Sequence, residues 1–152
     1  MDLPKSMLLS IIQCLYRSNY QKLIQENIQA NDDVLDVGSG LGFLKPLVIS
    51  QGASYQGFEP REYVYKAATN LYGSENFYNK ELDKNYSDIF FNKIISITVL
   101  DEVDEKLGFV KNIKSYSNND TNIIFAVRNA NFPFRRDVNV KSSYNNICTK
   151  DL

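Results

Sequence analysis

The chain has 152 residues, of which 43% are hydrophobic and 23% charged, and its formal net charge is −1. Such values are typical of one globular domain with its own core, and they give no sign of steering towards nucleic acid or an anionic membrane. The chain has no histidine, which excludes the usual general base and the usual metal ligand.

The cysteines and the lengths of the apolar segments indicate in which cellular compartment the protein is expected. Cys14 and Cys148 lie far apart and match no metal or redox motif, so we expect incidental thiols in a reducing environment. No apolar run reaches the roughly 20 residues of a transmembrane helix, and the first residues lack the pattern of a signal peptide. We therefore expect a cytoplasmic protein with no metal and no membrane partner.

Two amphipathic helices are expected before the first strand. Apolar residues follow helical spacing over 4–17, and a second helix begins at Tyr20 and ends near Ala30. These helices either cover a sheet edge or cap a ligand site. We assign residues 1–30 to this helical cap, 31–130 to the core and 131–152 to a tail, all within a single domain. The tail is expected to form either a short hairpin or a loop.

The stretch from Val34 to Gly42 reads as a buried strand followed by a glycine-rich turn. Val34, Leu35 and Val37 suit the centre of a parallel sheet. Gly38, Gly40 and Gly42 permit a sharp turn and the close approach of a ligand. A helix over 43–50 follows, with Gly52 suited to its end.

The remaining elements continue the alternation of strand and helix. They are a strand over 55–58, a helix from Pro60 to Gly73, a weak strand over 76–79, an irregular segment over 81–91, a strand over 93–100, a helix from Asp101 to about Tyr116 and a buried strand over 121–127. This order predicts an α/β fold with a doubly wound, mostly parallel sheet. In such sheets, ligands bind beyond the carboxyl ends of the strands.

The spacing of the glycine turn narrows the ligand. It reads G-x-G-x-G, with Phe43 where a dinucleotide-binding turn wants its third glycine, and no P-loop ending follows. Asp36 would repel a phosphate and favour a cationic group such as an amine. Glu59 ends the next strand, where a carboxylate can accept both hydrogens of a ribose diol.

These residues resemble a known family. Val34 to Gly42 resembles motif I of the class I S-adenosylmethionine-dependent methyltransferases, residues 57–60 resemble their acidic second-strand end, and 91–103 resembles their motif IV strand and turn. The resemblance implies a Rossmann-like methyltransferase fold and S-adenosylmethionine as the cofactor. The expected cofactor-binding residues are Asp36, Gly38, Ser39, Gly40, Gly42, Glu59, Pro60, Thr98 and Leu100.

Other positions are left open at this stage. Pro60 and Arg61 could flank the adenine, and either Asn79 or Glu81 could hold its amine. Asp101 and Glu102 are more often a helix start than catalysts, so no catalytic residue is assigned.

The chain departs from the family pattern in two places. Glu102 stands where many relatives that act on small molecules carry a histidine. The family sheet has seven strands, but the segment after Val127 is short, so we expect an abbreviated C-terminus. The strand over 121–127 would then be an exposed edge and a possible homodimer site.

Three functions are weighed. The first is a methyltransferase acting on a small molecule or biosynthetic intermediate, by direct displacement at the activated methyl group. The second is a truncated or non-catalytic module that binds the cofactor or a partner chain. The third, a nicotinamide-dependent dehydrogenase, is disfavoured by the glycine spacing.

Overall fold

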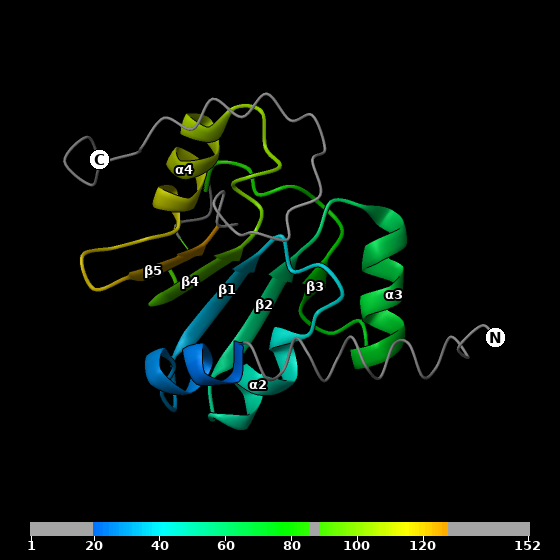
Figure 1. The fold of residues 1–152 in the computed structure, drawn as a ribbon. Helices are drawn as coiled ribbons and strands as arrows, with labels where there is room; N and C mark the ends of the chain where they lie inside the picture. The colour runs from blue at the N-terminus through cyan, green and yellow to red at the C-terminus, as the bar shows by residue number, and fades with distance from the viewer. Residues whose placement is uncertain (1–19, 86–88, 128–152) are drawn as a thin grey trace, which may run out of the picture.

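The computed structural model describes residues 20–85 and 89–127, which form a parallel sheet flanked by helices (Figure 1). The strands are β1 (Asp33–Val37), β2 (Ser54–Phe58), β3 (Phe77–Tyr78), β4 (Lys93–Ile97) and β5 (Asn122–Ala126), in the spatial order β3-β2-β1-β4-β5. The helices are one over 20–27, α2 (Leu44–Ser50), α3 (Glu62–Tyr72) and α4 (Lys106–Ser115). The predicted doubly wound, parallel α/β fold is confirmed. The expected helix over 4–17 and the tail lie outside the described residues.

The sheet is buried on both faces. Val34 and Ile95 face a cluster formed with the helix over 20–27, α2 and α3. Their chain neighbours Leu35 and Ile94 face the opposite cluster, which includes Ile113 of α4. Apolar residues at consecutive strand positions are therefore required by the two-sided burial that a parallel sheet imposes.

Two boundaries near β4 differ from the sequence prediction. The strand ends at Ile97 rather than Leu100, because Thr98 has a φ of +61° and leaves the extended conformation. Residues 101–105 form a turn instead of a first helical turn, and α4 starts at Lys106 with Glu105 as its N-cap. The Glu105 side chain accepts a hydrogen bond from the amide of Gly108, as an N-cap carboxylate does.

Two further boundaries involve α3 and β5. Helix α3 begins at Glu62 and ends at Tyr72, with Gly73 (φ +76°) as its C-cap, so Pro60 precedes the helix instead of occupying its first turn. Strand β5 was predicted to be buried, but Phe125 is 37% exposed. In the described part of the chain, β5 pairs with β4 alone, and this position explains its partial burial.

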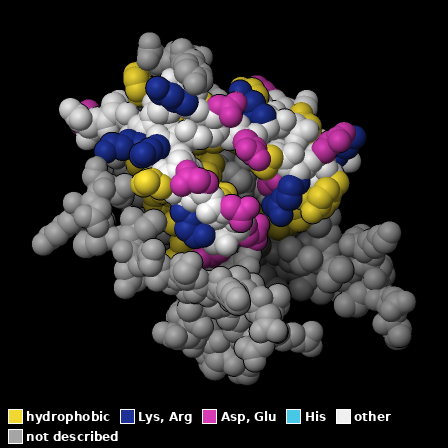
Figure 2. All heavy atoms as spheres, turned by 90° about the horizontal axis from the view of Figure 1, so that it is seen from above, with side chains coloured by type: hydrophobic (Ala, Val, Ile, Leu, Met, Phe, Trp, Pro, Cys, Tyr) yellow, Lys and Arg dark blue, Asp and Glu magenta, His cyan; other side chains and the backbone are white. Residues whose placement is uncertain are grey.

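The surface seen from above the sheet is mixed in character. Figure 2 shows acidic and basic side chains interspersed over the described residues on this face, with apolar side chains between them. None of the described helices is both long enough and apolar enough to cross a bilayer.

Candidate functional site

A cavity of about 380 Å³ opens beyond the carboxyl ends of β1 and β4. Strand order reverses between these two strands, and at such a switch point the connecting segments diverge to opposite faces of the sheet. The turn Gly38-Ser39-Gly40 forms one wall, and Thr98 and Val99 form another. The volume falls within the range usual for small-molecule sites.

The glycine turn is pinned to the neighbouring strand. The amides of Gly38 and Ser39 both donate to the carbonyl oxygen of Phe58, at 2.8 and 2.9 Å. Gly38 has a φ of +74°, and a Cβ there would lie 2.2 Å from Val99 Cγ2. Gly40 has a φ of +54° and nothing within 4 Å of a Cβ position, so it leaves open space beside the cavity. Gly38 therefore serves packing as well as turning, whereas Gly40 leaves room for a ligand.

Gly42, the third glycine, is absent from the cavity wall. Its φ is +75°, and a Cβ would lie 2.6 Å from Cζ of Phe77 on β3. Gly42 thus permits close packing between the start of α2 and the sheet. The next residue, Phe43, which stands where a dinucleotide-binding turn has its third glycine, does line the cavity.

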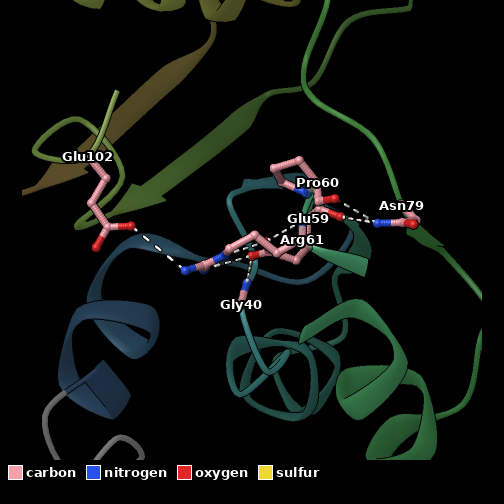
Figure 3. Close-up of polar contacts among 6 residues, drawn as sticks. All are labelled: Gly40, Glu59, Pro60, Arg61, Asn79 and Glu102. Atoms are coloured by element: carbon pink, nitrogen blue, oxygen red, sulfur yellow. Dashed lines mark hydrogen bonds and ion pairs between the residues drawn. The ribbon is translucent and has the colours of Figure 1, made fainter. Parts of the chain in front are cut away.

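Glu59 follows β2 directly and is only 2% exposed. Its Oε2 accepts from the Gly40 amide at 3.0 Å and from Arg61 Nη2 at 3.2 Å. Its Oε1 accepts from the Arg61 amide at 2.9 Å and from Arg61 Nε at 2.8 Å (Figure 3). These donors compensate a buried negative charge, which would otherwise be strongly unfavourable.

The segment after β3 fixes the backbone around Glu59. The amide of Glu59 donates to the carbonyl oxygen of Tyr78 at 3.0 Å. Asn79 Nδ2 donates to the carbonyl oxygens of Glu59 and Pro60, at 2.9 and 3.1 Å (Figure 3). Asn79 therefore holds the turn that carries Glu59. Pro60 is exposed and does not line the cavity, and Glu81 is exposed.

Asp36 lines the cavity from β1 although it is 2% exposed. Its Oδ2 accepts a 2.7 Å hydrogen bond from the Tyr55 hydroxyl. Burial raises the pKa of Asp36 to about 7, the hydrogen bond from Tyr55 offsets part of that rise, and the charge of Glu59 adds to it. Burial also raises the pKa of Tyr55 well above its ordinary value. Asp36 therefore titrates much closer to neutral pH than an ordinary carboxyl group does.

The opposite wall comes from the segment after β4. Thr98 lines the cavity, whereas Leu100 does not. The amide of Thr98 donates to the carbonyl oxygen of Ala126 at 2.7 Å, which holds its positive φ in place. Glu102 also lines the cavity, with Oε2 3.9 Å from Arg61 Nη1.

The cavity wall thus brings together five of the nine expected residues, Asp36, Gly38, Ser39, Gly40 and Thr98. Glu59 lies next to them but behind Arg61. The sequence analysis named Arg61 only as a residue that could flank the adenine, and it assigned no site role to Tyr63 or Val64; all three line the cavity. The available signal was their position just after a strand-ending carboxylate, at the edge where parallel strands place their ligands.

Comparison with known proteins identifies what the chain is similar to. A family model described as "Methyltransferase domain" matches residues 8–146. A comparison with curated protein sequences found no match.

Solved structures share the fold. A TehB-like SAM-dependent methyltransferase from Corynebacterium glutamicum is 21% identical with a TM-score of 0.60, and the match covers 68% of this chain and 59% of that one. A SAM-dependent methyltransferase from Aquifex aeolicus is 23% identical with a TM-score of 0.55, covering 64% and 57%. The magnesium protoporphyrin IX methyltransferase of Synechocystis, with bound SAM, is 22% identical with a TM-score of 0.56, covering 70% and 54%. The chain therefore matches little more than half the length of these structures.

Proposed function

Because the chain belongs to the methyltransferase domain family, we propose that it binds S-adenosylmethionine in the cavity beyond β1, β2 and β4 and transfers the methyl group to a small molecule. The observation that carries this proposal is the Glu59 carboxylate, buried at the end of β2 beside the open space at Gly40. Carboxylates of this kind accept hydrogen bonds from vicinal hydroxyls with both oxygens.

The residues present fit this cofactor. Glu59 would hold the ribose hydroxyls, and the turn from Gly38 to Gly40 leaves room for the ligand to approach the backbone. Asp36, with a pKa of about 7, would become fully ionised beside a cationic amino group. Thr98 would bound the cavity on the β4 side.

The chain's contribution to catalysis would be positioning. When bound, S-adenosylmethionine supplies a methyl group already activated by the sulfonium. The rigid glycine turn and the Thr98 segment would fix the orientation of that methyl group, and alignment of two reactants can contribute roughly 7–11 kcal/mol. The acceptor would enter past Arg61, Tyr63 and Glu102, which also line the cavity. A structural neighbour that is named for a magnesium porphyrin supports a small-molecule acceptor.

A thermal-shift experiment tests the cofactor. We expect S-adenosylhomocysteine, but not NAD, to raise the melting temperature, since any ligand selective for the folded state stabilises it. Glu59→Gln should remove the shift, because an amide offers one acceptor oxygen in place of two. Glu62→Gln is the matched control: Glu62 lies three residues away on α3, where its exposed side chain pairs with Lys66. A shift with NAD but none with S-adenosylhomocysteine would overturn the proposal, and an unchanged shift in Glu59→Gln would overturn the ribose assignment.

A further inference from the structure

Arg61 separates Glu59 from the cavity. The Arg61 side chain lines the cavity, whereas Glu59 does not. Figure 3 shows the Arg61 side chain extending from the end of β2 towards Glu102, on the turn after β4. A ligand that enters the cavity therefore meets the guanidinium before it meets the Glu59 carboxylate.

The hydrogen bonds of Glu59 divide into two kinds. Each carboxylate oxygen accepts one bond from a backbone amide, either Gly40 or Arg61, and one from the Arg61 guanidinium. An ionised carboxylate has about four acceptor positions, so this set occupies all of them. The two amides belong to the backbone, whereas the Arg61 guanidinium is carried on a long side chain that is 50% exposed.

We propose that Arg61 is a displaceable latch on the ribose site: a vicinal diol takes the place of the guanidinium on both Glu59 oxygens, and the guanidinium moves to Glu102. The identity of the diol ligand rests on the function proposed above. The exchange is one for one, because two hydroxyl donors replace two guanidinium donors while both backbone donors remain.

Glu102 makes the displaced position favourable. Its carboxylate already lies 3.9 Å from Arg61 Nη1, and its side chain is 50% exposed. At that distance the guanidinium stays beside the cavity mouth instead of being lost to water. The positive charge of Arg61 therefore remains close to Glu59 after the neutral diol has replaced the guanidinium. This nearby charge limits the unfavourable energy of burying a carboxylate that has lost its ion pair.

The latch predicts that loss of the guanidinium tightens ligand binding. We expect Arg61→Met to bind S-adenosylhomocysteine about tenfold more tightly than wild type by calorimetry, because the ligand no longer displaces an ion pair. Lys66→Met is the control, because it removes the same charge from the exposed face of α3 and should leave affinity unchanged. Arg61→Lys keeps the charge but lacks the two-donor guanidinium, so its affinity for S-adenosylhomocysteine should fall between those of wild type and Arg61→Met.

Two further comparisons test the mechanism. Arg61→Met should bind adenosine more tightly than wild type does. It should bind 2′,3′-dideoxyadenosine, which lacks the diol, no more tightly than wild type does. Glu102→Gln should weaken S-adenosylhomocysteine binding when Arg61 is present and have no effect in Arg61→Met.

The outcomes separate the latch from the proposed function. If wild type binds S-adenosylhomocysteine and Arg61→Met binds it equally or more weakly, the latch is wrong and the function stands. If Arg61→Met binds 2′,3′-dideoxyadenosine more tightly than wild type does, by the same factor as for adenosine, then the proposed exchange of donors at Glu59 is wrong. If no variant binds S-adenosylhomocysteine, the proposed function itself fails. Circular dichroism and melting of each variant show whether it is folded.

Discussion

The buried carboxyl of Asp36 should make the stability of the protein fall as pH rises from about 4 to about 7. Burial raises the pKa of Asp36 from 3.8 to about 7 in the folded protein. Between these values the folded state holds a proton that the unfolded state has released, so the free energy of unfolding decreases with pH. The contribution is complete below pH 4, is lost through pH 7, and amounts to about 4 kcal/mol at an order of magnitude.

The substitution Asp36→Asn isolates this effect. An asparagine can still accept a hydrogen bond from the Tyr55 hydroxyl but never ionises. We expect the variant to match wild type in stability at pH 4.5, where the folded-state carboxyl is neutral like the amide, and to be more stable than wild type at pH 8. Urea unfolding at half-unit pH intervals measures the difference, and Asp120→Asn, in the exposed turn before β5, is the control. A difference between wild type and Asp36→Asn that is constant with pH would refute the reasoning.

Tyr55→Phe provides a second arm of the same experiment. The Tyr55 hydroxyl donates to Asp36 and stabilises its ionised form, which lowers the carboxyl pKa. Without this donor the pKa of Asp36 should move higher still. The pH window over which stability is lost should then extend above 7, whereas an unchanged window would show that the hydroxyl does not govern the carboxyl.

Three further changes test particular positions. Gly42→Ala should lower the free energy of unfolding by about 2–3 kcal/mol in urea titrations, because its Cβ would lie 2.6 Å from Phe77 Cζ. Gly40→Ala, with a φ of +54° and open space around its Cβ position, should lose only about 1 kcal/mol, and equal losses in the two variants would refute the clash. Thr98→Gly should raise stability by roughly 1 kcal/mol by relieving a φ of +61°, and a clear loss would contradict strain there. Asn79→Ala should weaken S-adenosylhomocysteine binding about threefold to tenfold in calorimetry, because the turn carrying Glu59 loses two hydrogen bonds; unchanged affinity would show that other contacts suffice to hold it.

Much of the fold follows from local sequence signals. The apolar run of β1 and the glycines after it depend on neighbouring residues alone, so their strand and turn were predictable. The position of Glu59 beside that turn was also predictable, because parallel strands place their carboxyl ends at one edge of the sheet.

The missed features depend on contacts between distant segments. The partner of Asp36 is Tyr55, 19 residues away, and their meeting is set by the register between β1 and β2. The packing role of Gly42 depends on Phe77 of β3. Thr98 is β-branched, and its local preference favours a continuing strand. The hydrogen bond to Ala126 and the path of the following turn override that preference.

Asp36 and Glu59 come from neighbouring strands and are equally buried, but their partners differ. Asp36 accepts a hydrogen bond from a neutral hydroxyl, and its pKa is raised to about 7. Glu59 has four donors, two of which belong to the half-exposed Arg61 guanidinium. A ligand with a neutral diol could replace those two donors, and one with a positive charge would favour the ionised form of Asp36. A single molecule that carries both groups would satisfy the two carboxylates together. Each group alone would bind less well, because a diol without the cation leaves the buried Asp36 carboxyl without a charged partner, and a cation without the diol leaves Arg61 on Glu59.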